Sequence, residues 1–285
     1  MLITALLFGC APGPGSLDVE KVHRQAQAAL DQWADAVAKA GAPPVIPVGE
    51  LTGQVGNWEA AVGDNNKRAL MGGLVFTAAP LEGDAQADGE VRWPDGSTTK
   101  VPVMAAQDAL VAISKTAPTT CDDCTPLTAT RATLIAGPIQ TSRGPATAPI
   151  WSFDIDGTDV EVTRVAIQNT IIVPALPWDP IFPSYGLHLD SATGSVQGTG
   201  LTVAFVGAPE AGAKPCGEDY SAEAVESELA IVVLVTRHPH FSILGTGCTA
   251  VGARRTATAE LASPLADRVV LSVDDGQPVP TIILP

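Results

Sequence analysis

The sequence has little positive charge. Its 285 residues include 16 lysines and arginines against 31 aspartates and glutamates, which gives a net charge of −15. An acidic surface repels phosphate backbones, so this composition argues against nucleic acid as a partner. It also disfavours adsorption to anionic lipid head groups. Attachment to a membrane would therefore require a covalent lipid or a helix that spans the bilayer.

The sequence also lacks a long hydrophobic run beyond its first residues. A spanning helix needs roughly 20 apolar residues. The longest later candidates, residues 165–176 and 229–235, are shorter or are interrupted by polar residues. We interpret both as buried strands.

Motifs that carry chemistry are scarce. The chain has four histidines, no G-x-S-x-G sequence, no glycine-rich phosphate loop and no second C-x-x-C. His238-Pro239-His240 fits a loop between strands, with weak transition-metal capture as the alternative. The acidic run 154–159 has its glycine at the fourth position rather than the sixth, so we interpret it as a hairpin turn and not a calcium loop. The sequence therefore predicts no catalytic residue, no cofactor and no metal site.

The N-terminus has a pattern of its own. A short apolar run ends in Leu7-Phe8-Gly9-Cys10, which resembles the lipobox of bacterial lipoproteins. The resemblance implies a signal peptide over residues 1–9 and a lipidated Cys10, carrying palmitate or a similar chain. Residues 10–16 would form a flexible spacer from the membrane. No positive residue precedes the apolar run, so either the true start lies upstream or the signal is atypical. The alternative is a hydrophobic strand with a buried cysteine.

The other cysteines agree with export. Cys121, Cys124, Cys216 and Cys248 are an even number, as expected for disulfides in an exported chain. Three pairings are open, and sequence proximity favours Cys121–Cys124 and Cys216–Cys248. The two aspartates inside the C-x-x-C raise thiol pKa values, which is wrong for a redox nucleophile. We interpret this pair as a structural disulfide, with redox activity or a metal site as alternatives.

The body of the chain reads as mainly β. The chain contains 27 glycines and 24 prolines, which suit many short strands joined by turns. One amphipathic helix is predicted over residues 17–40. The overall prediction is an α+β fold, with an N-terminal helix on a β-rich body followed by a small all-β, sandwich-like domain. The predicted boundaries are an α+β domain at 17–175, a proline-rich linker at 176–186 and an all-β domain at 187–285.

Hairpins are predicted at Pro94-Asp95-Gly96 and Asp156-Gly157, and a similar turn at Asp274-Asp275-Gly276. Strands that flank the second turn alternate polar and apolar residues. We expect their apolar faces to lie in the core. The residues concerned are Trp151, Phe153, Ile155, Val160 and Val162.

One segment combines polar residues with an aromatic side chain, as binding loops often do. It could equally be a capped turn held by hydrogen bonds. The candidate ligand-binding residues are Trp58, Glu59, Asn65, Asn66, Lys67 and Arg68.

Three stretches together resemble exported lipoproteins of high-GC actinobacteria that have no assigned activity. The stretches are Trp58–Lys67, Thr141–Trp151 and the pair Cys248–Gly252 and Pro264–Arg268. The resemblance implies an extracytoplasmic location and assigns no catalytic residue. We therefore expect a membrane-anchored, extracytoplasmic lipoprotein that binds a protein or cell-wall partner without being an enzyme. The alternative is an envelope hydrolase that acts on wall glycan or peptide at the Trp58–Arg68 segment.

Overall fold

A computed structural model describes residues 14–41, 43–58, 65–115, 120–171, 173, 187–214, 216–239 and 251–284. The described part of the chain is mostly β, with three helices and several sheets, which confirms the mainly β, α+β prediction. The chain forms two compact units. The 36–172 unit contains the described residues of Ala36–Ile172 and Pro280–Ile283, and the 173–279 unit contains those of Met1–Asp35 and Val173–Val279 together with Leu284.

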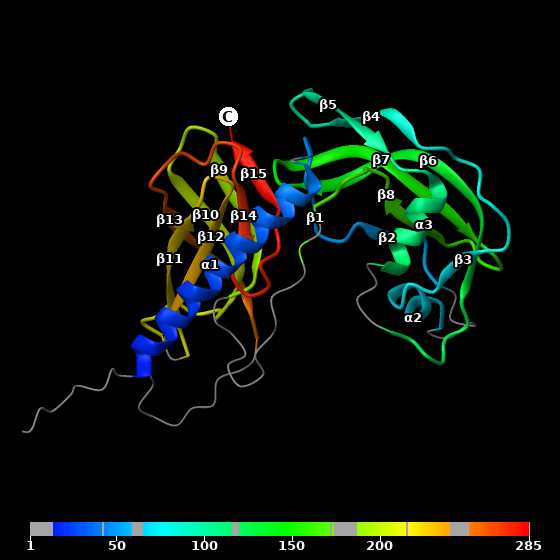
Figure 1. Cartoon of the computed structure of the whole chain (residues 1–285). Helices are drawn as coiled ribbons and strands as arrows, with labels where there is room; N and C mark the ends of the chain where they lie inside the picture. Colours follow the sequence, from blue (N-terminus) through cyan, green and yellow to red (C-terminus); the bar gives the residue numbers. More distant parts are fainter. Residues whose placement is uncertain are drawn as a thin grey trace, which may run out of the picture. The chain divides into compact units, whose positions relative to one another are not determined.

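The 36–172 unit is a large sheet with two short helices (Figure 1). Its elements are β1 (Pro47–Val48), β2 (Thr52–Val55), α2 (Asn65–Met71), β3 (Val75–Thr77), β4 (Gln86–Arg92), β5 (Thr98–Val103), α3 (Ala106–Lys115), β6 (Leu127–Thr141), β7 (Gly144–Ile155), β8 (Glu161–Val165) and most of β15 (Thr281–Leu284).

Strand β7 is the centre of this sheet. It pairs with β6 along one edge, and β4 and β8 share its other edge. Residues 148–153 are all buried, so the strand is covered on both faces. Trp151 and Phe153 pack with Ile113 of α3 in one cluster, while Ile150 packs with Ile139 in another. The predicted core positions around the Asp156-Gly157 turn are confirmed.

The predicted turn chemistry is also confirmed in this unit. The hairpin of β4 and β5 turns at Pro94-Asp95-Gly96, where Gly96 has a φ of 85°. Asp95 accepts hydrogen bonds from the backbone and the hydroxyl of Ser97, and these bonds lower the pKa of the Asp95 carboxyl. The β6–β7 hairpin turns at Ser142 and Arg143, and the Arg143 guanidinium lies 4.7 Å from the ring centroid of Trp93.

The 173–279 unit combines one long helix with strands of two sheets (Figure 1). Its elements are the first part of α1 (Pro14–Ala40), β9 (Leu189–Ser195), β10 (Gly200–Gly207), β11 (Glu218–Glu226), β12 (Ala230–Pro239), β13 (Ala253–Glu260) and β14 (Val269–Ser272).

These elements form three layers. Strands β13, β10 and β9 are consecutive in one sheet, and β11, β12 and β14 make the other. Phe205 of β10 and Tyr220 of β11 meet edge to face at 4.9 Å, which joins the sheets. On the far side of the second sheet, the His23 ring of α1 lies 3.1 Å from the Glu223 carboxylate of β11. Residues 230–235 of β12 are buried without a break, as expected for a strand between two layers.

The helix differs from the prediction in its start and in its place. It begins at Pro14, three residues before the predicted start, and proline fits the first turn of a helix. Its predicted apolar stripe is buried at Ala26, Ala29 and Trp33, but Val19 is 53% exposed. The predicted 17–175 domain grouped the helix with the first half of the chain, whereas residues up to Asp35 belong to the 173–279 unit. An apolar stripe does not encode which sheet it will cover.

An ion pair fixes the loop before β14. Arg268 donates from Nη1 to Glu226 Oε2 at 2.6 Å and from Nη2 to the carbonyl oxygens of Ser263 and Pro264. The pair keeps only 10% and 18% side-chain exposure. Burial alone would raise the pKa of Glu226, but the Ala262 N–H and the guanidinium outweigh it and hold that pKa below its ordinary value. The stretch Pro264–Arg268 is therefore a structural turn.

We predict that Arg268→Ala lowers the free energy of unfolding by about 2 kcal/mol at neutral pH, because it leaves a largely buried carboxylate unpaired. A carboxylate with a depressed pKa stabilises the fold above its unfolded pKa and loses that effect as the pH falls through the folded value. The gap between wild type and variant should therefore shrink below pH 4.5, the ordinary value for Glu226.

Urea unfolding at several pH values measures this gap. Arg254→Ala is the matched control, because Arg254 is exposed and makes a single 3.3 Å hydrogen bond to Ser191. Equal losses for the two arginine variants, or a gap that does not change with pH, would contradict the prediction.

Candidate functional site

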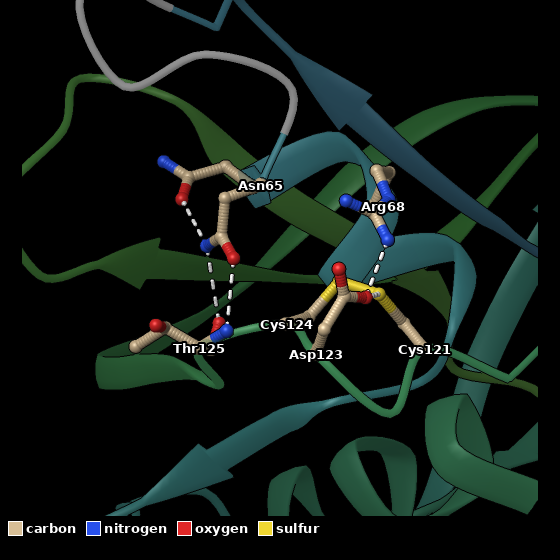
Figure 2. The surroundings of a disulfide bond; sticks show 7 residues. Asn65, Arg68, Cys121, Asp123, Cys124 and Thr125 are labelled. Carbon is tan, nitrogen blue, oxygen red and sulfur yellow. Dashed lines mark hydrogen bonds and ion pairs between the residues drawn. A yellow bond between two sulfur atoms is a disulfide. The ribbon is translucent and has the colours of Figure 1, made fainter.

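The predicted binding segment lies against the disulfide loop. Asn65 opens helix α2, and its side chain makes two bonds to the Thr125 backbone (Figure 2). Its Oδ1 accepts from the Thr125 N–H at 2.8 Å, and its Nδ2 donates to the Thr125 carbonyl at 3.1 Å. One turn further on, Arg68 forms an ion pair with Asp123. Two side chains of α2 thus hold the loop at Thr125 and at Asp123.

The loop itself is closed by a disulfide between Cys121 and Cys124 (Figure 2). This confirms the predicted local pairing and leaves neither sulfur as a thiolate for metal or redox chemistry in this state. Cys216 is disulfide-bonded as well. Its predicted partner, Cys248, lies outside the described residues.

The other residues of the segment have different surroundings. The Trp58 indole donates to Gln54 Oε1 at 2.6 Å, and its ring packs on the core of the 36–172 unit. Asn66 accepts a hydrogen bond from Asn65 at 3.2 Å, and Lys67 is exposed. Glu59 lies outside the described residues. The described contacts of this segment are those of a structural clamp, and they do not gather its side chains around a ligand-sized space.

The topology of the 36–172 unit creates a different candidate site. Val48 of β1 pairs with Gln140 of β6, and the Leu51 carbonyl accepts from the Val165 N–H of β8 at 2.9 Å. In a flat sheet, the four spacings from β1 through β6, β7 and β8 to β2 would span about 19 Å. The three Cα steps from Val48 to Leu51 reach at most about 11 Å. The sheet must therefore curl until its two edges approach.

Two glycines permit this curl. Gly49 has a φ of 80°, a left-handed conformation that other residues rarely adopt, and it turns the chain between β1 and β2. At Gly137 an added Cβ would lie 2.6 Å from Ile150 Cδ1, so the missing side chain leaves room for that isoleucine. On the opposite side of β8, the buried Arg164 donates from Nη1 to Thr52 at 2.8 Å and ties β2 to β8.

The curled sheet encloses a groove of about 440 Å³, within the range of about 300–1,000 Å³ seen for small-molecule sites. Most of its lining is aliphatic side chain, glycine or proline, and Glu50, Gln140 and Thr163 add polar groups. Among the described residues, the Glu50 carboxylate makes no hydrogen bond or ion pair. The groove thus offers an apolar wall with one negative charge at its rim. Sequence reasoning missed the groove, because it depends on β1 and β2 pairing with strands that lie far away in the chain.

A second cluster lies in the 173–279 unit, at the predicted Asp274-Asp275-Gly276 turn. His188 Nδ1 lies 2.9 Å from Asp274 Oδ2, and Ser272 donates to Asp274 Oδ1 at 2.5 Å. Partial burial lowers the pKa of His188, but Asp274 and the neighbouring carboxylates outweigh it and raise that pKa overall. Burial raises the pKa of Asp275. Serine, aspartate and histidine meet here in the wrong order for a hydrolytic triad, because the aspartate, not the histidine, contacts the serine.

A serine–histidine contact does occur elsewhere in this unit. His238 and Pro239 belong to β12, which corrects the loop interpretation for these two residues. His240 lies outside the described residues. The Ser221 hydroxyl lies 2.8 Å from His238 Nε2, and Asp219 is directly opposite His238 in the antiparallel register. All three side chains are exposed on β11 and β12. Strand pairing brought them together, and spacing along the chain carried no signal of it.

Comparisons with known protein families, with curated proteins and with solved structures found no match. Within the described ranges, none of the helices has the length and apolar character needed to cross a membrane.

We predict that Asn65→Ala lowers the free energy of unfolding by about 1 kcal/mol, because the Thr125 peptide group loses two partners. Asn66→Ala, one residue along the same helix, should change it by less than about 0.5 kcal/mol. Urea unfolding with the disulfide intact compares the two. If the Asn66 variant is the less stable one, the clamp at Thr125 is not what holds this loop.

Proposed function

We propose that this chain is a lipid-anchored, extracytoplasmic protein of a bacterial envelope that binds a partner or wall component and is not an enzyme. The observation that supports an extracytoplasmic location is disulfide bonding. Cys121 is bonded to Cys124, and Cys216 also takes part in a disulfide. Disulfides persist in oxidising compartments and are rare in the cytosol.

Cys10 lies outside the described residues, so the support for anchoring through it comes from the sequence. The apolar run, the small Gly9 and the cysteine occur in the order found in lipoproteins. A net charge of −15 disfavours simple adsorption to anionic lipid, so an acyl chain supplies the attraction. The resemblance to exported actinobacterial lipoproteins agrees with this compartment.

The binding role is supported by the groove of the 36–172 unit. Ligand sites combine apolar walls with a few polar groups that orient the ligand. Here the walls include Ile139, Ile150 and Val165, and the single titratable group of the lining is Glu50. Charge complementarity favours a ligand with an aliphatic part and an amine, and cell-wall peptides carry both kinds of group.

The alternative is an envelope hydrolase, and one observation favours it. Ser221 and His238 are in hydrogen-bond contact, as a nucleophile and its general base must be. The pair lies on exposed strands rather than in a pocket, so it lacks the enclosed, preorganised surroundings that stabilise a developing oxyanion. We therefore favour the binding protein.

Lipidation is tested by metabolic labelling of cells with a radioactive fatty acid. We expect the wild-type chain to be labelled and Cys10→Ser to remain unlabelled, because only the cysteine sulfur can form the thioether. Cys10→Ala is a second variant with the same expectation. Equal labelling of wild type and both variants would show that Cys10 is not the lipidated residue.

Binding is tested by sedimenting the full chain, in detergent, with purified cell-wall sacculi. We expect wild type to pellet and Glu50→Gln to bind about fivefold more weakly, as the loss of one ion pair of about 1 kcal/mol predicts. Glu82→Gln is the matched control, because Glu82 is an exposed acid outside the groove lining and its substitution changes the net charge equally.

The outcomes separate the hypotheses. Equal pelleting of both glutamate variants would exclude the groove as the binding surface. If labelling succeeds but neither wild type nor any variant pellets with the sacculi, the lipid-anchored location is supported and wall binding is wrong. Release of soluble wall fragments by wild type, abolished in Ser221→Ala, would replace the binding protein with the hydrolase.

A further inference from the structure

Three potential metal-binding side chains converge at one place in the 173–279 unit. His188 precedes β9, and Asp274 and Asp275 form the turn after β14. One donor atom from each residue lies within 4.8 Å of the other two. The imidazole distinguishes this group from an ordinary acidic patch, because nitrogen and carboxylate oxygen together are a donor set for transition metals.

The surrounding structure orients both carboxylates. Ser272 donates to Asp274 Oδ1, and the Gln277 N–H donates to Asp275 Oδ1 at 2.9 Å. Helix α1 steadies the start of the turn, where Gln25 donates to the Val273 carbonyl at 2.7 Å. Partners of this kind position ligating carboxylates around metals and are needed for tight binding.

The turn also carries unbalanced negative charge. Asp275 is half-buried, and its carboxylate accepts from the Gln277 N–H, with no lysine or arginine in contact with it among the described residues. Asp274 and Asp190 add to the negative potential at His188. A carboxylate withdrawn from water without a cationic partner costs free energy, and a bound cation offsets that cost.

We propose that His188, Asp274 and Asp275 bind a divalent transition-metal ion of the zinc class. Zinc accepts histidine nitrogen and carboxylate oxygen at about 2.0–2.2 Å in tetrahedral sites. Donor atoms already within 4.8 Å of one another need only small side-chain rotations to share such an ion. The His188–Asp274 hydrogen bond is then replaced by two bonds to the metal, and water completes the coordination.

The ion would join two sheets. His188 directly precedes β9 of one sheet, while the two aspartates follow β14 of the other. Because an ion that binds only the folded state stabilises it, metal binding is expected to raise the melting temperature of this unit. This inference is independent of the groove and of the proposed wall binding.

Isothermal titration of the full chain, in detergent, with zinc chloride tests the site. Excess magnesium is included, because it occupies nonspecific acidic sites. We expect one zinc ion per chain, with affinity reduced at least tenfold in His188→Ala and in Asp275→Asn. Matched controls are His23→Ala and Asp267→Asn, which remove a histidine whose side chain is 43% exposed and an exposed carboxylate charge elsewhere in the same unit and should bind as wild type does.

Thermal unfolding with and without zinc provides the second measurement. We expect zinc to raise the melting temperature of wild type and of both controls but not of the two site variants. If His188→Ala does not fold, Asp275→Asn decides, because it keeps the size of the side chain and its acceptor for the Gln277 N–H. Absence of zinc binding by wild type, or equal binding by the site variants and the controls, would overturn the proposal.

Discussion

The 36–172 unit depends on the burial of β7 from both sides. Its residues alternate between two hydrophobic clusters, with Trp151 and Phe153 facing the helices α2 and α3 and Ile150 facing the concave side of the sheet. A strand covered on both faces must have a sheet that wraps around it or a layer on each side. Here helices cover one face, and the curled sheet covers the other. The groove at Gly49 and Glu50 is the remaining opening of that curl.

Many polar side chains of the described residues hold loops in place through hydrogen bonds and ion pairs. Arg268 holds the loop before β14, Asn65 and Arg68 hold the disulfide loop, and Arg237 forms a two-point ion pair with Glu218. These contacts explain why stretches that look rich in chemistry lie outside a reaction centre. A protein with a low proportion of charged residues uses its few ion pairs where loops must be fixed. The groove and the His188–Asp274–Asp275 cluster differ, because Glu50 lines a groove of about 440 Å³ and the cluster gathers three potential metal-binding side chains at one turn.

Sequence reasoning succeeded where the signal is local. The alternating residues of β7 and β8, the Asp156-Gly157 and Pro94-Asp95-Gly96 turns, the Cys121–Cys124 pairing and the buried centre of α1 all follow from neighbours along the chain. Strand β11 was missed, because Glu218–Glu226 is rich in acids and alanine and is stabilised by Tyr220 and by pairing with β12. The role of α1 was assigned to the wrong half of the chain, because a stripe of alanines fits any closely packed sheet.

The sequence by itself determined a mainly β body, its tight turns, a local disulfide and an acidic surface. Each of these depends on spacing of a few residues or on composition. Only the tertiary structure decided where α1 packs, how β1 and β2 close the curled sheet, and that Ser221 meets His238 and His188 meets Asp274. Those contacts join residues far apart in the chain. Their geometry is set by strand pairing and twist, which no local pattern of residue types encodes.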